Sequence, residues 1–156
     1  MKITILAVGT KMPSWVTQGY QEYAKRLPRD MSLELIEISL GVRGKNADIQ
    51  RAIKKESDAI LSNIDKADHV IALEVKGHNW STEKLAQNME RWQMDGLNLV
   101  LLVGGPDGLS DACRARANQQ WSLSALTLPH PIVRVILSEQ IYRAWTVTQN
   151  HPYHRS

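Results

Sequence analysis

The residue types best suited to chemistry gather at the C-terminus of this 156-residue chain, in the segment 143–156. Arg143 and Arg155 are permanent cations that can pair with phosphate or stabilise a developing anion. His154 can accept or relay a proton near neutral pH, and the ring of Tyr153 can stack on a base. No acidic residue interrupts the segment. It therefore predicts a surface that faces RNA, with a frayed C-terminus as the alternative.

Two histidines of this segment raise the question of a metal site. His151 and His154 lie three residues apart, but Pro152 prevents a regular helix between them. The only cysteine, Cys113, lies far away in the sequence. This is a poor match to the ligand spacing of zinc sites, so we expect no metal.

A second set of candidates lies where apolar strands are expected to end. The pairs Leu73–Glu74 and Gly104–Gly105 and the run 123–128 each mark the end of a strand-like segment. Ligands of open α/β sheets bind outside the carboxyl ends of the strands, so these ends predict one crevice. Glycines let a ligand approach the backbone, and a short apolar run offers a wall whose backbone groups can read the edge of an adenine. A plain turn and a buried strand end are the structural alternatives.

Phosphate-binding motifs are missing from these positions. The glycine loop 104–108 lacks the lysine and the Ser/Thr of a P-loop. The three spaced glycines of the dinucleotide fingerprint follow neither this strand nor the first one. Gly9–Thr10–Lys11 resembles the end of a P-loop without its upstream glycine, and we interpret it as a coincidence. Nucleoside triphosphates and dinucleotides are therefore disfavoured as ligands.

The elements that position these residues alternate between strand-like and helix-like segments. This alternation predicts an α/β fold with an open, mostly parallel sheet and helices on both faces. Asn98–Val103 is an uninterrupted apolar run, typical of a central parallel strand that is buried on both faces. The expected strands cover residues 2–8, 33–39, 69–75, 98–103 and 121–124. The expected helices run from 14 to Pro28, from about 46 to 62, from 81 or 82 to Gly96, from 110 to about 118, and from 132 to 148.

Local signals predict how some of these elements begin and end. Ser14, Ser81 or Thr82, and Ser110 are expected to cap helices, because a hydroxyl can accept a bond from an unpaired backbone N–H. The run Gly77–His78–Asn79 is expected to turn the chain after the third strand.

The totals fit a single soluble domain that covers residues 1–156. Hydrophobic residues make up 43% and charged residues 22%, as in ordered globular proteins. The single Cys113 cannot form an internal disulfide, and no run approaches the roughly 20 apolar residues of a membrane span. The apolar run Ile3–Val8 is too short for the core of a signal peptide. We expect a cytoplasmic protein, and the net charge of +3 is compatible with an anionic partner without requiring one.

Short motifs occur along the whole chain in a particular order and spacing. They are Ala7–Lys11, Arg43–Asn46, Leu102–Gly108, Trp121–Ser124, Thr127–His130, Tyr142–Ala144 and Asn150–His154. Taken together, these motifs resemble the small SPOUT-class pseudouridine N3-methyltransferases of large-subunit rRNA, the ribosomal RNA large subunit methyltransferase H family. The resemblance extends over the whole chain and its length. Two departures are visible: Asp107 where glutamate is common, and Ser156 at a variable end.

The resemblance implies a C-terminal trefoil knot, a homodimer with each active site near the interface, and S-adenosylmethionine as cofactor. The implied substrate is a pseudouridine of large-subunit rRNA within the ribosome, methylated at N3. We expect the catalytic groups in Arg143, Tyr153, His154 and Arg155. The positions expected to bind the cofactor are Leu73, Gly104, Gly105, Leu123, Ser124, Ala125, Leu126, Thr127 and Leu128.

Two rival functions stay open at this point. One is a SPOUT methyltransferase with another RNA substrate, such as tRNA or a 2′-hydroxyl group. The other is a non-catalytic RNA-binding factor of ribosome assembly that uses the basic C-terminal segment. An assembly factor has no need of a sulfonium cofactor, so cofactor binding separates the second rival from the enzyme.

Overall fold

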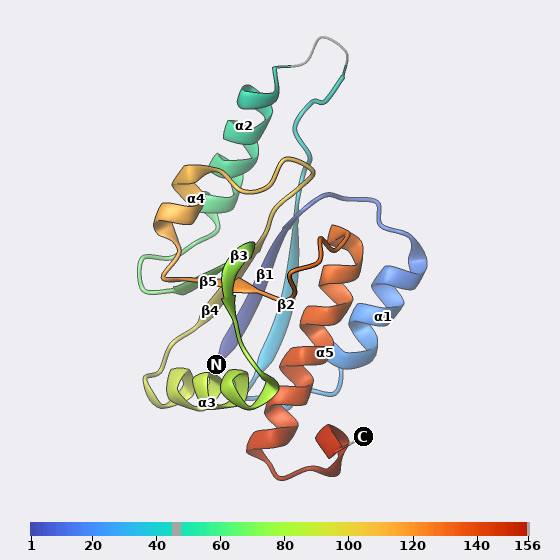
Figure 1. Cartoon of the computed structure of the whole chain (residues 1–156), viewed down its shortest axis with the longest axis vertical. Helices are drawn as coiled ribbons and strands as arrows, with labels where there is room; N and C mark the ends of the chain where they lie inside the picture. The colour runs from blue at the N-terminus through green and yellow to red at the C-terminus, as the bar shows by residue number, and fades with distance from the viewer. Residues whose placement is uncertain (45–47, 156) are drawn as a thin grey trace.

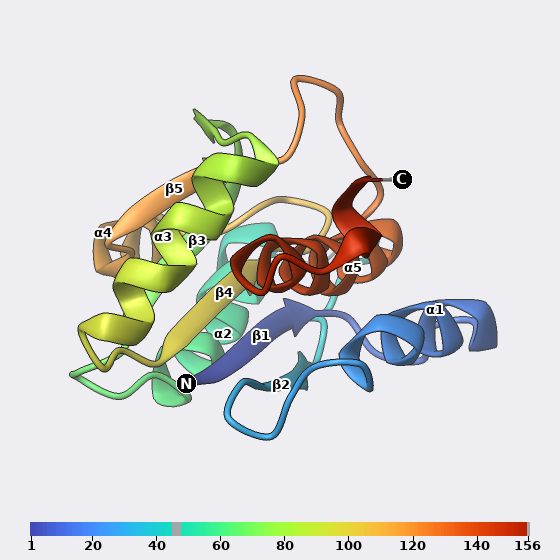
Figure 2. The same cartoon turned by 90° about the horizontal axis from the view of Figure 1, so that it is seen from below.

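The computed structural model describes residues 1–44 and 48–155, which form a five-stranded parallel sheet between two layers of helices (Figures 1 and 2). The strand order is β2-β1-β4-β3-β5, and every pairing is parallel. The predicted fold class is confirmed.

The strands are β1 (Lys2–Val8), β2 (Ser32–Ile38), β3 (His69–Asn79), β4 (Leu99–Val103) and β5 (Gln119–Ser122). The helices are α1 (Ser14–Ala24), α2 (Ile49–Ser62), α3 (Thr82–Met94), α4 (Asp111–Arg116), α5 (His130–Thr148) and the 3₁₀ helix η1 (Pro152–Arg155).

The two faces of the sheet are covered by different helices. The helices α1, α3 and α5 pack on one face, and α2 and α4 pack on the other (Figure 2). Alternate residues of β1 divide between the two cores: Ile3 and Ile5 face α5, whereas Leu6 and Val8 face α2 and α4. Every residue of β4 is buried, as its unbroken apolar run predicted. The carboxyl ends of the central strands therefore meet at one edge of a rigid sheet.

The first helix differs from its prediction at both ends. Pro13 occupies the N-cap position of α1 and Ser14 is already helical, so the prediction that Ser14 caps the helix is wrong. The helix ends at Ala24, before Pro28. The reason is local: Arg26 and Leu27 donate their backbone N–H groups three residues back, which tightens the chain into a turn.

The third strand is longer than predicted. The expected turn at Gly77–Asn79 is wrong, because β3 continues through these residues and pairs with β5 a second time after a shift in register. A Cβ on Gly77 would lie 2.7 Å from the backbone carbonyl carbon of Gln120. Gly77 therefore allows a close approach of two strands, a role that a sequence does not distinguish from a turn.

Smaller shifts affect the other elements. The strand expected at 121–124 is Gln119–Ser122, because the Ser122 hydroxyl donates to the Ser124 carbonyl and folds the chain over. Helix α5 begins at His130 and takes Pro131 into its first turn, where a missing N–H costs nothing. Ser81 and Ser110 cap α3 and α4 as predicted. The predicted start of α2 at Asn46 lies outside the described residues; within them, Asp48 caps that helix.

Candidate active site at the carboxyl ends of the strands

The three strand ends singled out in the sequence surround one cavity of about 370 Å³. Leu73 of β3 lines one side of the cavity. Gly104 and Gly105, after β4, line a second side, and the loop after β5 lines the third. The volume falls in the range of small-molecule sites, and the lining is mostly apolar. Ala125 is the one predicted cofactor position that does not line the cavity; it is exposed on the same loop. The lining also includes Glu74, Val75, Val103, Pro106, Gly108, Leu109, Trp121, Leu123, Ser124, Leu126, Thr127, Leu128, Pro129, His130 and Val133.

The glycine loop that follows β4 is tightly folded. Gly105 and Gly108 form an antiparallel bridge, and Gly108 adopts a positive φ of 77°. A Cβ on Gly104 would lie 2.8 Å from the backbone carbon of Gly108, closer than side chains tolerate. The loop therefore needs glycine at these positions, and its backbone is bare on the side of the cavity.

A partly buried ion network holds this glycine loop from its outer side. Arg43 donates to Asp107 of the loop through Nε, with an N–O distance of 2.6 Å. Its Nη1 donates to Glu56 of α2 at 2.6 Å, and the Glu56 side chain is only 3% exposed. The Gly41 N–H donates to the same carboxylate at 2.7 Å. The loop after β2, helix α2 and the glycine loop are thus fixed to one another through one guanidinium.

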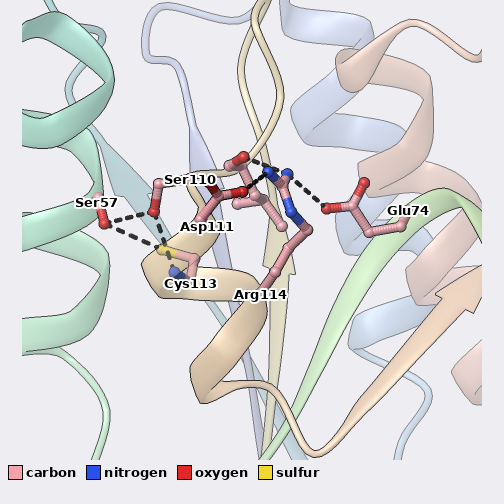
Figure 3. A network of polar contacts seen from close by, with 7 residues as sticks. Ser57, Glu74, Ser110, Asp111, Cys113 and Arg114 are labelled. Atoms are coloured by element: carbon pink, nitrogen blue, oxygen red, sulfur yellow. Dashed lines mark hydrogen bonds and ion pairs between the residues drawn. The ribbon is translucent and has the colours of Figure 1, made fainter. Parts of the chain in front are cut away.

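A second arginine fixes the wall between β3 and α4 (Figure 3). Arg114 donates to the backbone carbonyl of Leu109 and to the carboxylates of Asp111 and Glu74. Both Leu109 and Glu74 line the cavity. Arg114 therefore holds two parts of the wall that lie 35 residues apart in the sequence.

Two titratable residues of the cavity were not among the predicted site residues. Glu74 directly follows Leu73, and His130 opens α5. Burial, and secondarily the charge of Arg134, lowers the pKa of His130, so its ring is neutral at neutral pH. Its Nδ1 is buried and has no hydrogen-bond partner among the described residues. The available signal was position alone: both residues stand at the carboxyl edge of the sheet.

The predicted catalytic residues lie away from this cavity in the same chain. Arg143 follows His130 by 13 residues on α5, which places it about 20 Å further along the helix axis. Figure 1 shows the C-terminus beside the far end of α5. None of Arg143, Tyr153, His154 and Arg155 lines the cavity. The structure thus divides the candidates into two groups.

The C-terminal segment is folded against α5. Tyr153 meets Tyr142 edge-on at a centroid distance of 4.7 Å, and the Arg143 guanidinium lies 5.0 Å from the Tyr153 ring centre. Arg143 also donates to Glu139 at 2.6 Å. Burial, followed by Glu139, raises the pKa of Tyr153, so the phenol stays protonated at neutral pH. Arg155 is exposed. These contacts form an ordered cationic and aromatic surface, in contrast to the frayed alternative.

A cavity at the carboxyl ends of a parallel sheet defines a ligand-binding α/β domain, and the family comparison gives its chemistry. The model of the family "Predicted SPOUT methyltransferase" matches residues 1–154, and the chain belongs to this methyltransferase family. It is similar to the ribosomal RNA large subunit methyltransferase H of Hahella chejuensis, at 64% identity over 99% of both chains. The protein of the same name from Marinomonas sp. is also 64% identical, over 99% of this chain and all of the relative.

A solved structure supports the fold. The crystal structure of a probable rRNA-methyltransferase from Porphyromonas gingivalis superimposes with a TM-score of 0.57 over 94% of this chain and 69% of the other. Only 12% of the residues are identical, so this likeness concerns the fold alone. The trefoil knot goes with membership of the SPOUT family.

The described residues include neither a candidate membrane span nor a candidate metal site. No helix among them is both long and apolar enough to cross a membrane. Within residues 1–44 and 48–155, no three side chains of His, Cys, Asp or Glu are grouped as metal ligands would be.

Proposed function

We propose that this methyltransferase transfers a methyl group from S-adenosylmethionine to N3 of a pseudouridine in large-subunit rRNA, in the cytoplasm. The observation that carries the proposal is the meeting of three strand ends around one cavity. Those ends contain the positions expected to bind the cofactor. The relatives at 64% identity are named ribosomal RNA large subunit methyltransferases, which supports the substrate class.

The cavity fits the cofactor in size and chemistry. The wall formed by Leu123, Leu126 and Leu128 offers apolar surface for an adenine ring, with backbone groups at its edge. Bare backbone at Gly104 and Gly105 allows close approach of the ligand. When bound, the cofactor supplies an electrophilic methyl group on a sulfonium. The protein supplies position and electrostatics.

The target nitrogen determines what the rest of the site must do. N3 of pseudouridine carries a proton and becomes a good nucleophile only as that proton leaves. His154 accepts or relays the proton in our proposal, and Arg143 and Arg155 stabilise the negative charge on the base. Tyr153 stacks on or orients the base.

These groups reach a cavity only through a second copy of the chain. About 20 Å of helix α5 separates Arg143 from His130, which lines the cavity of the same chain. We therefore propose a homodimer in which the C-terminal segment of one protomer completes the cavity of its partner. The cationic segment then faces RNA while the cavity presents the methyl group.

The assembled ribosome is the proposed form of the substrate. The net charge of +3 on the whole chain gives limited attraction for naked RNA. A preformed ribosomal surface would add contacts that a single small domain does not make with a flexible stem-loop.

A labelling experiment tests the function. Purified protein is incubated with radiolabelled S-adenosylmethionine and, separately, with unmethylated large subunits, whole ribosomes and naked rRNA. We expect label in rRNA from assembled particles, located at N3 of a pseudouridine. Label in tRNA or at a 2′-hydroxyl would favour the other SPOUT substrate. Absence of both label and cofactor binding by calorimetry would leave the assembly factor as the better reading.

A further inference from the structure

Glu74 stands out because it is the one acidic side chain among the described residues that line the cavity. It follows Leu73 in β3, and its side chain is 22% exposed. A carboxylate in an otherwise apolar lining is costly unless it has a partner. The structure gives it one partner in the described part of the chain, Arg114, at 3.4 Å from Oε1.

Arg114 is itself held in place by a short chain of polar contacts (Figure 3). It lies on α4, whose N-cap Ser110 accepts from the Cys113 N–H at 3.1 Å. The Ser110 hydroxyl also pairs with Ser57 of α2 at 2.7 Å. The guanidinium therefore approaches Glu74 from a fixed helix, and the carboxylate is oriented before any ligand arrives.

The cofactor offers three kinds of group to a carboxylate: the ribose hydroxyls, the ammonium of the methionine part and the sulfonium. Arg114 offsets part of the charge of Glu74, from which it lies 3.4 Å away; it lies closer to Asp111, but that carboxylate is 98% exposed and screened by solvent. A partly offset carboxylate attracts a cation less strongly than a bare one does, yet it retains a carboxylate oxygen as a hydrogen-bond acceptor. Neutral hydroxyl donors suit it best.

We propose that Glu74 accepts hydrogen bonds from the ribose hydroxyls of the cofactor and that Arg114 is the positioning residue for this carboxylate. This inference rests on the proposed function, since it takes S-adenosylmethionine as the ligand. It assigns a role to Glu74, which the sequence placed only at the end of a strand, and to Arg114, which the sequence did not single out. It also explains why Arg114 donates to the Leu109 carbonyl as well as to Glu74: these two contacts fix the distance between the two parts of the cavity wall.

Calorimetry with three ligands tests the assignment. S-adenosylmethionine, S-adenosylhomocysteine and 5′-methylthioadenosine all carry the ribose, whereas the last lacks the ammonium and only the first has the sulfonium. We expect Glu74→Gln to weaken all three by about tenfold, as loss of a hydrogen bond to a charged group does. Glu74→Asp keeps the charge and should recover part of the affinity. The matched control is Glu90→Gln, an exposed position on α3.

The ligand pattern decides the outcome. Weakening confined to the two amino-acid-bearing ligands would assign Glu74 to the ammonium, and weakening of S-adenosylmethionine alone would assign it to the sulfonium. Either result overturns the ribose assignment. In addition, 2′-deoxy and 3′-deoxy forms of methylthioadenosine should bind wild-type protein less well, with no further loss in Glu74→Gln. If the wild type binds none of the ligands, the proposed function fails instead.

The role of Arg114 has its own readout. Arg114→Gln should raise KM for the cofactor about threefold to tenfold and leave kcat at saturation nearly unchanged, because it acts through Glu74 rather than on the methyl group. Arg114→Lys should restore part of the affinity. In the Glu74→Gln background, Arg114→Gln should have little further effect on cofactor affinity. A full additive loss there would overturn the positioning role.

Discussion

The two ends of α5 present opposite kinds of surface. At its first turn, His130 and Val133 close a cavity made of apolar side chains and bare backbone. At its last turns, Arg143 packs beneath the ring of Tyr153 among other cations and aromatic rings. The first surface is concave and is locked by the networks of Arg43 and Arg114. The second is partly exposed and carries the groups that can move a proton or hold an anion.

This contrast separates binding from chemistry. The cavity has the shape for a small ligand, but few of its groups can stabilise a charged transition state. The C-terminal segment has those groups but no cavity. About 20 Å of helix separates them in one chain. In the homodimer that we propose, each region therefore works with the opposite region of the other protomer.

The largest effect is expected from removing a cation of the C-terminal segment. Arg143→Ala should lower turnover by about a hundredfold to a thousandfold, the usual loss when one group that stabilises transition-state charge is removed. His154→Ala should lower turnover by about a hundredfold as a lost acid–base group. Affinity for the cofactor should change less than about twofold in both, measured by calorimetry, because neither residue lines the cavity of its own chain and both are proposed to act on the RNA base.

The control for these variants is Lys54→Ala, which removes an exposed cation of α2, outside both the C-terminal segment and the cavity. A parallel loss of cofactor binding in Arg143→Ala or His154→Ala would remove the division of labour between the two regions.

Mixed dimers test whether the regions cooperate between protomers. One chain carries Leu128→Trp, which fills the cavity, and the other carries Arg143→Ala. Each homodimer should be nearly inactive. Random pairing makes half of the dimers mixed, and each mixed dimer has one intact site, in which the cavity of the Arg143→Ala chain meets the C-terminal segment of the Leu128→Trp chain. Activity should therefore recover to about a quarter of the wild-type value.

The same mixture distinguishes the alternative directly. If a segment served the cavity of its own chain, no mixed dimer would contain a complete site, and the activity of the mixture would stay at the level of the homodimers. Analytical ultracentrifugation of each sample shows that dimers form, and circular dichroism checks that Leu128→Trp folds.

A smaller effect is expected at the outer support of the glycine loop. Asp107→Asn removes the charge that pairs with Arg43 and leaves the buried Glu56 contact intact. Affinity for the cofactor should fall about threefold while the free energy of unfolding changes by less than about 1 kcal/mol, since the pair is partly exposed. Arg43→Gln strands the buried Glu56 carboxylate and should cost about 3 kcal/mol of stability.

Calorimetry and urea unfolding separate these two results. Lys54→Gln is the control, because it breaks an exposed pair with Asp58 on α2, away from the loop. If Asp107→Asn bound the cofactor as well as the control did, the Arg43 network would serve stability alone.

The sequence predicted the sheet and the positions of its ends because these depend on local patterns. The apolar run of β4, the cap at Ser110 and the break after Val103 are readable within a few residues. The rule that ligands bind at the carboxyl ends of parallel strands then placed Leu73 and Gly104 at one cavity. The assignment of a cofactor to them came from the resemblance to a family and remains a proposal.

What the sequence did not predict depends on contacts between distant residues. Gly77 was expected in a turn, but its role is set by the backbone of Gln120, 43 residues later. The partners of Glu74 and Arg43 likewise lie on other elements, so neither residue has a local signal. The distance between the C-terminal segment and the cavity follows from the direction of α5, which only the three-dimensional structure gives.

The smallest expected effect is on the pH dependence of stability, and it concerns His130 at the cavity end of α5. The pKa of His130 is lowered in the folded protein by burial and by Arg134. The unfolded chain therefore binds this proton more tightly than the folded protein does. The neutral His130 ring contributes to the free energy of unfolding above pH 6.5, and this contribution is lost as the pH falls below that value. Thermal unfolding followed by circular dichroism at pH 7.5 and 5.0 measures the loss. In His130→Gln the drop in Tm between the two pH values should be about 1 to 2 °C smaller than in wild type.

The control His78→Gln removes an exposed histidine outside the cavity and should leave the drop unchanged. An identical drop in His130→Gln and wild type would mean that the ring is not held neutral by the cavity, and that acid acts on the protein elsewhere.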